Sequence, residues 1–186
     1  MKKRLMIYVL LSLLLSPCGA QQKMRDVFLQ MPDSLLPYLT ENNRLDFLDF
    51  MDSKMKAEVT NELGGKSEML SLSDSALTLR VSSAMTVAMR LMPVTEAIDS
   101  CQQVVCVITT YGKDAPESHL AVYSVRWHPL LADQYLSGLP RPPYEASFVE
   151  GTTSTILFKG SIALDPIAYE EQKKENAWLK NIEWRP

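Results

Sequence analysis

The sequence is poor in the residues that build metal and nucleotide sites. Its 186 residues include only two histidines, His119 and His128, and seven glycines. The histidines lie at opposite ends of one expected strand, roughly 30 Å apart at about 3.3 Å per residue, so they are too distant to share a metal ion. The glycines form neither G-x-x-x-x-G-K nor G-x-G-x-x-G, the loops that hold phosphates. We therefore expect no metal and no nucleotide or other cofactor.

An excess of positive charge is also absent. The chain has 19 Lys and Arg against 22 Asp and Glu, which gives a net charge of -3. No basic stripe with interleaved aromatic residues occurs, so nucleic acid is not an expected partner. The hydrophobic share of 46% and the charged share of 22% are those of an ordinary globular domain. A disordered tail, a fibrous repeat and a multi-pass membrane protein are excluded.

Residues 1–20 have the three regions of a secretory signal peptide. A positive start at residues 2–4 precedes an apolar run at residues 5–15, about half of the roughly 20 residues that span a bilayer. Small residues at 18–20 predict cleavage after Ala20, which leaves Gln21 as the first residue of an exported chain. Cleavage removes three positive charges and moves the net charge from -3 to -6. The mature chain has no expected transmembrane segment.

The same stretch contains a possible lipoprotein signal. In Leu15-Ser16-Pro17-Cys18, the cysteine would be acylated and become the new amino terminus. A proline directly before the cysteine is unfavourable for that processing, whereas residues 18–20 suit the ordinary signal peptidase. We favour a soluble exported protein, in the periplasm or at the cell surface, over a lipid-anchored one.

The mature chain has two cysteines, Cys101 and Cys106. On a continuous strand they would lie beyond disulfide reach and on opposite faces. A tight turn at Gln102 and Gln103 would allow a bridge, which an oxidising compartment would permit. We favour two unbridged, mostly buried thiols and keep a local disulfide as the alternative.

The N-terminal third of the mature chain has helical periodicity. We expect a short helix at residues 23–30 and then a turn capped by Asp33 or Ser34. The longest helix is expected from Thr40 to about Met55. Its apolar stripe recurs at three- and four-residue spacing, with Phe47 at the edge, and comprises Leu45, Leu48, Met51 and Met55.

Beyond Gly64-Gly65 the period changes to two, which is typical of strands. Expected strands are 77–81, 85–91, 104–110, 120–127, 146–149 and 155–159, with a long proline-containing connection at 130–144 and a charged helix at 168–176. Neighbouring strands in sequence favour antiparallel pairing. The predicted fold class is α+β, with N-terminal helices packed on an antiparallel meander sheet, in a single domain at residues 21–186.

One N-terminal block resembles a known family. The block consists of MPDSLLPYLT at residues 31–40, NRLD at 43–46 and MKAEVTN at 55–61. It resembles an uncharacterised family of exported gut-bacterial proteins, a domain of unknown function. The resemblance extends over the mature chain, including Trp127-His128-Pro129 and the tryptophan-bearing tail. It implies export and a single domain, and it brings no catalytic residue, cofactor or substrate.

The connection at 130–144 and its flanks supply the candidate ligand-binding residues. Aromatic side chains beside polar groups in a proline-stiffened loop suit stacking on a sugar or contact with a protein. The candidates are Trp127, His128, Tyr135, Arg141 and Tyr144. In the alternative interpretation, these aromatic residues fold back over a face of the sheet.

Candidate catalytic groups are sparse. Asp46, Asp49 and Asp52 recur every third residue on one expected helix, a pattern that a cation or an acid/base pair would use but that a solvated helix face explains. Ser34 has no G-x-S-x-G context. The leading hypothesis is a non-enzymatic binding module at the cell envelope that recognises an envelope protein or a glycan. The alternatives are a small secreted hydrolase that pairs Asp46 or Asp49 with a histidine, and a structural subunit of an envelope assembly.

Overall fold

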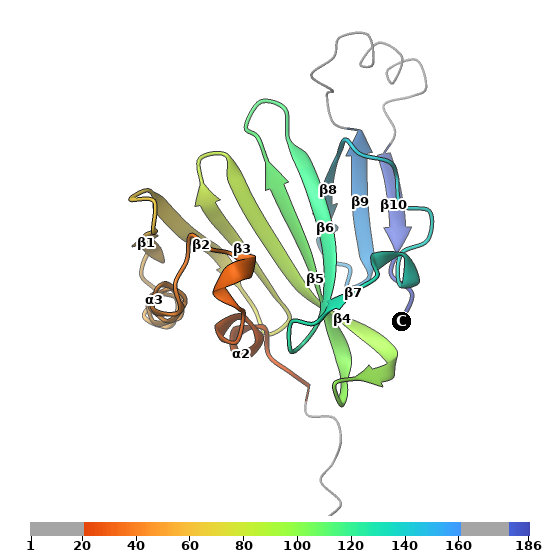
Figure 1. Cartoon of the computed structure of the whole chain (residues 1–186), viewed down its shortest axis with the longest axis horizontal. Coiled ribbons are helices and arrows are strands. Elements are labelled where there is room, and N and C mark those ends of the chain that lie inside the picture. Colours follow the sequence, from red (N-terminus) through yellow and green to blue (C-terminus); the bar gives the residue numbers. More distant parts are fainter. Residues whose placement is uncertain (1–20, 161–178) are drawn as a thin grey trace, which may run out of the picture.

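Two antiparallel sheets and a small group of helices make up the structure. The computed structural model describes residues 21–160 and 179–186. Seven strands form the first sheet in their order of sequence, and three later strands form the second. The helices pack on one face of the first sheet, and the second sheet packs on the other (Figure 1). The predicted helices on an antiparallel meander are confirmed in outline, in a molecule that is mostly β.

The first sheet is a simple meander. Its strands are β1 (Glu58–Thr60), β2 (Lys66–Leu72), β3 (Ala76–Ser82), β4 (Met85–Ile98), β5 (Cys101–Tyr111), β6 (Glu117–Ser124) and β7 (Pro129–Leu130). Leu77, Leu79 and Val81 are buried, as their alternation predicts. The sequence did not reveal β1 and β2, because their apolar residues are few. Gly64 and Gly65 lie in the turn between these two strands.

The second sheet corrects the expected single meander. It consists of β8 (Tyr144–Phe148), β9 (Thr155–Gly160) and β10 (Leu179–Glu183), in the order β10-β9-β8. The expected strands at 146–149 and 155–159 are β8 and β9, but they leave the first sheet and pack on its face through Ala146, Ile156 and Phe158. The signal peptide, Cys18 and the expected helix at 168–176 lie outside the described residues.

The helices are α2 (Met24–Leu29), the 3-10 turn η1 (Asp33–Leu35) and α3 (Glu41–Asp52). Thr40 caps α3 through reciprocal hydrogen bonds with Asn43, so its start is as predicted. The predicted stripe was partly wrong. Leu45 is 43% exposed and Met55, beyond the helix, is 59% exposed, whereas α3 buries Arg44, Phe47 and Leu48.

A buried arginine explains why α3 turns a different face to the sheet. The Arg44 side chain is 3% exposed. Its Nη1 donates to Asp33 Oδ1 at 2.7 Å and to the Leu39 carbonyl at 3.0 Å. Asp33 therefore pairs with Arg44, and neither Asp33 nor Ser34 caps the turn η1, which begins after Pro32 without a side-chain cap. A buried charge needs such partners, and this pairing fixes the rotation of α3.

The two faces of the first sheet belong to different hydrophobic cores. Val105 and Val107 of β5 face the helices, whereas Val104, Cys106 and Ile108 face the second sheet. Cys101 lies in the helix-side core and Cys106 in the other, and both thiols are free. The expectation of two unbridged, buried cysteines on opposite faces is confirmed.

The Cys106 thiol should be unreactive in the folded protein. Burial raises the pKa of Cys106 to about 12, so the nucleophilic thiolate is absent at neutral pH. We expect a thiol reagent at pH 8 to leave Cys106 unmodified until denaturant is added, and then to modify it. Peptide mass mapping after alkylation measures this. Rapid labelling of Cys106 in the native protein would contradict its buried placement.

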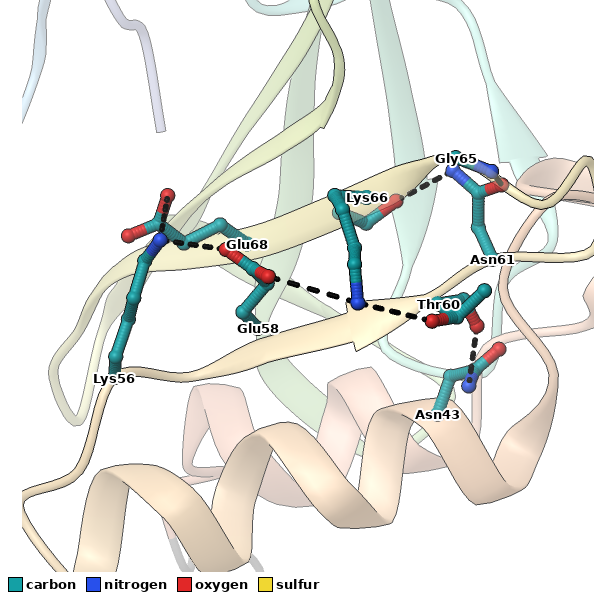
Figure 2. Close-up of polar contacts among 9 residues, drawn as sticks. Asn43, Lys56, Glu58, Thr60, Asn61, Gly65, Lys66 and Glu68 are labelled. Carbon is teal, nitrogen blue, oxygen red and sulfur yellow. Dashed lines mark hydrogen bonds and ion pairs between the residues drawn. The ribbon is translucent and has the colours of Figure 1, made fainter.

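The β1 edge of the first sheet is covered by alternating charges. Lys56 Nζ lies 2.5 Å from Glu58 and 4.0 Å from Glu68, and Lys66 Nζ lies 3.7 Å from Glu58. Figure 2 shows how these side chains meet above β1 and β2. Arg80 on β3 also pairs with Glu68. Such exposed pairs contribute little stability, because water and salt screen the charges. Charges on an edge strand discourage pairing with another chain, which is the role that this network suits.

Candidate binding cleft

Trp127 of the predicted ligand loop lies in the helix-side core. The expected strand 120–127 ends earlier, at Ser124, because the chain turns there and Trp127 adopts a left-handed backbone with φ of 67°. This turn directs the indole inward, where it is 6% exposed. Its Nε1 donates to the Val27 carbonyl of α2 at 2.9 Å. Trp127 therefore fastens α2 to the sheet.

The other two aromatic residues of that loop lie in the second core. Tyr135 follows the 3-10 turn η2 (Ala132–Gln134) and stacks on Trp184, with ring centroids 4.7 Å apart. Tyr144 meets Phe158 edge-on at 5.1 Å. The sheet thus separates Trp127 from Tyr135 and Tyr144. This burial matches the alternative interpretation, in which the aromatic residues fold back over the sheet.

The two polar candidates of the loop are exposed. His128 Nδ1 lies 3.2 Å from Asp99 Oδ2 at the tip of the β4–β5 hairpin, and Arg141 lies at the surface. The structure therefore does not gather Trp127, His128, Tyr135, Arg141 and Tyr144 into one surface. Sequence proximity did not predict this, because a turn and a change of sheet separate the five side chains.

The structure does not bring the helical carboxylates to a histidine either. Asp46, Asp49 and Asp52 are exposed on α3, which contacts β1 and β2. His119 lies on β6, four strand positions from β2, or roughly 19 Å at about 4.8 Å per strand. Within the described ranges, no group of three His, Cys, Asp or Glu side chains is arranged to hold a metal ion. Nothing in this placement favours the hydrolase alternative.

A cleft of about 650 Å³ lies at the N-terminal end of β3. Ala76, the first residue of β3, pairs with Arg90 of β4, and beyond this pair β4 and β5 continue as a two-stranded hairpin to the turn at Asp99 and Ser100. The volume falls in the usual range for small-ligand sites, about 300–1,000 Å³. The walls come from the β2–β3 turn, β4, the start of β5, the β8–β9 turn and the N-terminal segment. The lining residues are Gln21, Ser73, Ser75, Ala76, Arg90, Leu91, Pro93, Cys101, Gln102, Gln103, Thr152 and Thr153.

Arg90 is the charged residue of this cleft. It lies on the β4 face that carries Met92, and its guanidinium is 4.4 Å from the centroid of the Phe148 ring on β8. Its Nη1 donates to the carbonyls of Thr152, at 2.7 Å, and Val149, at 3.5 Å. These contacts join the β8–β9 turn to the first sheet. Among the described residues, Nε and Nη2 of Arg90 have no hydrogen-bond acceptor in the protein.

The electrostatics of the cleft favour an anion. No carboxylate lines it. Among residues 21–160 and 179–186, the Arg90 side chain donates to the carbonyls of Val149 and Thr152 and no carboxylate pairs with it. Burial lowers the pKa of the Arg90 guanidinium, because the charge has lost water without gaining a counter-ion. The other lining groups are mainly hydroxyls and side-chain amides, which donate and accept hydrogen bonds. An anionic group bound here would restore the interactions that the guanidinium lost.

A second hollow, of about 140 Å³, lies on the helix side between η1 and strands β5 and β6. Tyr111, His119 and Tyr123 line it, together with the edge of Trp127. Its volume is below the usual range for a small-ligand site. The cleft at Arg90 is therefore the better candidate.

Little in the amino-acid sequence signals this cleft. Arg90 occupies a solvent-side position in the alternating strand 85–91, which predicts a side chain in water. Gln102 and Gln103 suggest only a turn between the cysteines. Ser73, Thr152 and Gln21 come from distant segments with no shared motif. The run of polar residues at 151–154 next to two short strands was the available hint that a second sheet meets the first.

Comparison with known proteins places the chain in a family. Residues 18–167, a range that contains every residue of the cleft, match the family described as "Protein of unknown function (DUF3256)". The chain belongs to the DUF3256 family. This match confirms that the chain resembles a domain of unknown function, as the N-terminal block indicated. No curated protein matches the chain.

A solved structure shows that this DUF3256 chain shares its fold with another protein. The match is described as the structure of a domain of an uncharacterized protein from Porphyromonas gingivalis W83. It covers 83% of this chain and 89% of that one, with a TM-score of 0.63 and 20% sequence identity. At this identity the likeness concerns the fold alone. Within the described residues, no helix has the length and apolar character needed to cross a membrane.

Proposed function

We propose that the protein is an exported, non-enzymatic binding module of the bacterial cell envelope, and that its cleft holds a carboxylate of the ligand against Arg90. The observation that carries the proposal is that Arg90, which is half-buried and has no carboxylate partner within the described residues, lines a cleft of about 650 Å³. Export is supported by the signal-peptide pattern of residues 1–20.

The ligand class follows from the chemistry of the lining. A planar guanidinium with free N–H donors suits a carboxylate, which accepts two parallel hydrogen bonds. Hydroxyls and amides around it suit sugar hydroxyls or a peptide backbone. Acidic glycans and the carboxyl ends of peptides both present this chemistry at the cell envelope. The partner is therefore a carboxylate-bearing glycan or an envelope protein.

A ligand screen tests this function. The panel pairs uronic-acid oligosaccharides with neutral ones, and short peptides ending in a carboxylate with the same peptides ending in an amide. A ligand at about a hundred times its dissociation constant adds roughly 2.7 kcal/mol to the free energy of unfolding, which thermal unfolding detects. We expect stabilisation by acidic members and none by their neutral partners.

The role of Arg90 is tested on any ligand from the screen. Arg90→Met keeps an unbranched stem over Phe148 and removes the charge, so affinity should fall about 10- to 150-fold, the equivalent of roughly 1.5–3 kcal/mol for a charged hydrogen bond. Arg90→Lys should retain part of the affinity. Arg80→Met, an exposed arginine on the neighbouring strand β3, is the matched control. Unchanged affinity in folded Arg90→Met would refute the proposed site.

A further inference from the structure

The residue that export would place at the amino terminus lies in the cleft. Cleavage after Ala20 makes Gln21 the first residue, and Gln21 lines the same cleft as Arg90. Its side chain is exposed, and it forms no hydrogen bond with another described residue. The amide of Gln21 is therefore available to its own backbone nitrogen.

The segment that follows Gln21 is anchored to the first sheet. Gln22 N–H donates to Gln103 Oε1 at 2.8 Å, and Met24 N–H donates to the Asp74 carbonyl at 2.8 Å. Gln103 lines the cleft, and Asp74 lies between the cleft residues Ser73 and Ser75. These bonds hold the new amino terminus at the cleft instead of leaving it on a free tail.

From this placement we infer that Gln21 of the exported protein is converted to pyroglutamate within the cleft. The inference rests on the export part of the proposed function. The nitrogen of the Gln21 α-amino group attacks Cδ of the same residue and forms the C–N bond of a five-membered lactam. The bond from Cδ to the side-chain nitrogen breaks, and that nitrogen leaves as ammonia with a proton from the attacking amine. The reaction needs no oxidant, reductant or co-reactant.

The chemistry is compatible with neutral pH. Attack requires the unprotonated amine, and an α-amino group has a pKa of about 7.7–8.0, so a fraction is reactive near pH 7. Cyclisation removes the positive charge of the terminal ammonium. The lactam keeps one N–H donor and one carbonyl acceptor at the cleft, and Arg90 stays the charged group that an anion meets.

Intact-mass measurement tests the inference. The full chain with its signal is expressed in a host that exports it, and the protein recovered from the periplasm or medium is weighed and subjected to amino-terminal sequencing. We expect the mass of residues 21–186 less one ammonia and a blocked amino terminus. The matched variant Gln21→Asn should show the full mass and a readable first residue, because its side chain is one methylene too short for a five-membered ring.

Each other outcome overturns the inference in a different way. An unblocked chain that begins with intact Gln21 shows export without cyclisation, so the proposed function survives. A chain that starts at another residue, or with an acylated Cys18, would show that cleavage does not occur after Ala20. Gln21 would then not be the first residue and could not form the lactam. A chain that keeps residues 1–20 and stays inside the cell also contradicts export.

Discussion

Trp127→Ala should lower the free energy of unfolding by about 3–5 kcal/mol, the usual cost of truncating a buried tryptophan. The indole is 6% exposed, packs at 5.6 Å against Tyr123 and donates to the Val27 carbonyl. The substitution leaves a cavity under α2 and an unpaired carbonyl on that helix. Denaturant unfolding, followed by far-UV circular dichroism, measures the change.

Trp127→Phe separates the two contributions. The phenyl ring retains most of the packing but has no N–H donor. The free energy of unfolding should therefore fall by less than in Trp127→Ala, with about 0.5–1.5 kcal/mol of the decrease due to the lost hydrogen bond. Both variants should bind the cleft ligand with unchanged affinity once folded, since Trp127 does not line the cleft. A stable Trp127→Ala protein that loses ligand binding would instead restore the sequence-based prediction of a binding role for Trp127.

Trp184→Ala should lower the free energy of unfolding by a similar amount, about 3–5 kcal/mol, because it truncates a buried side chain of the second core. The ring is 4% exposed, stacks on Tyr135 and donates from Nε1 to the Pro93 carbonyl at 2.7 Å. Pro93 lines the cleft, so the Trp184 hydrogen bond connects the segment after β10 to a residue of the cleft. We therefore expect weaker ligand binding as well as lower stability.

The matched control is Trp184→Phe, which keeps an aromatic ring to stack on Tyr135 and loses the bond to Pro93. Its stability should lie between those of the native protein and Trp184→Ala. Calorimetric titration of the ligand gives affinity, and denaturant unfolding gives stability. If Trp184→Ala bound ligand with native affinity, the hydrogen bond to Pro93 would have no part in shaping the cleft.

Both predictions arise from one feature, the sharing of strands β4 and β5 between two cores. Leu91 faces the helices and Met92 faces the second sheet, so adjacent residues of β4 pack in different cores. The cleft lies where this shared pair of strands emerges beyond β3. Its walls therefore depend on the β8–β9 turn and on the N-terminal segment, which reach it from opposite ends of the chain.

Local patterns predicted much of the secondary structure. Alternating residues in β3 and β4 predicted the buried faces of those strands, and Thr40 marked the start of α3. Helix rotation was less predictable, because the burial of Arg44 depends on Asp33 and the Leu39 carbonyl. Leu45 and Leu48 are equally apolar, so periodicity alone did not show that Leu45 faces water.

From the amino-acid sequence follow the helices ahead of a run of antiparallel strands, the buried faces of β3 and β4, the absence of phosphate-binding loops and the expectation of export. The surface that covers each strand depends on tertiary packing. Arg90 meets Thr152 across 62 positions of sequence, and Gln22 meets Gln103 across 81. Periodicity records that a face is buried or solvated, and it holds no information on the partner, since any apolar layer can cover an apolar face. For that reason the cleft at Arg90 emerged only when the two sheets and the N-terminal segment were packed together.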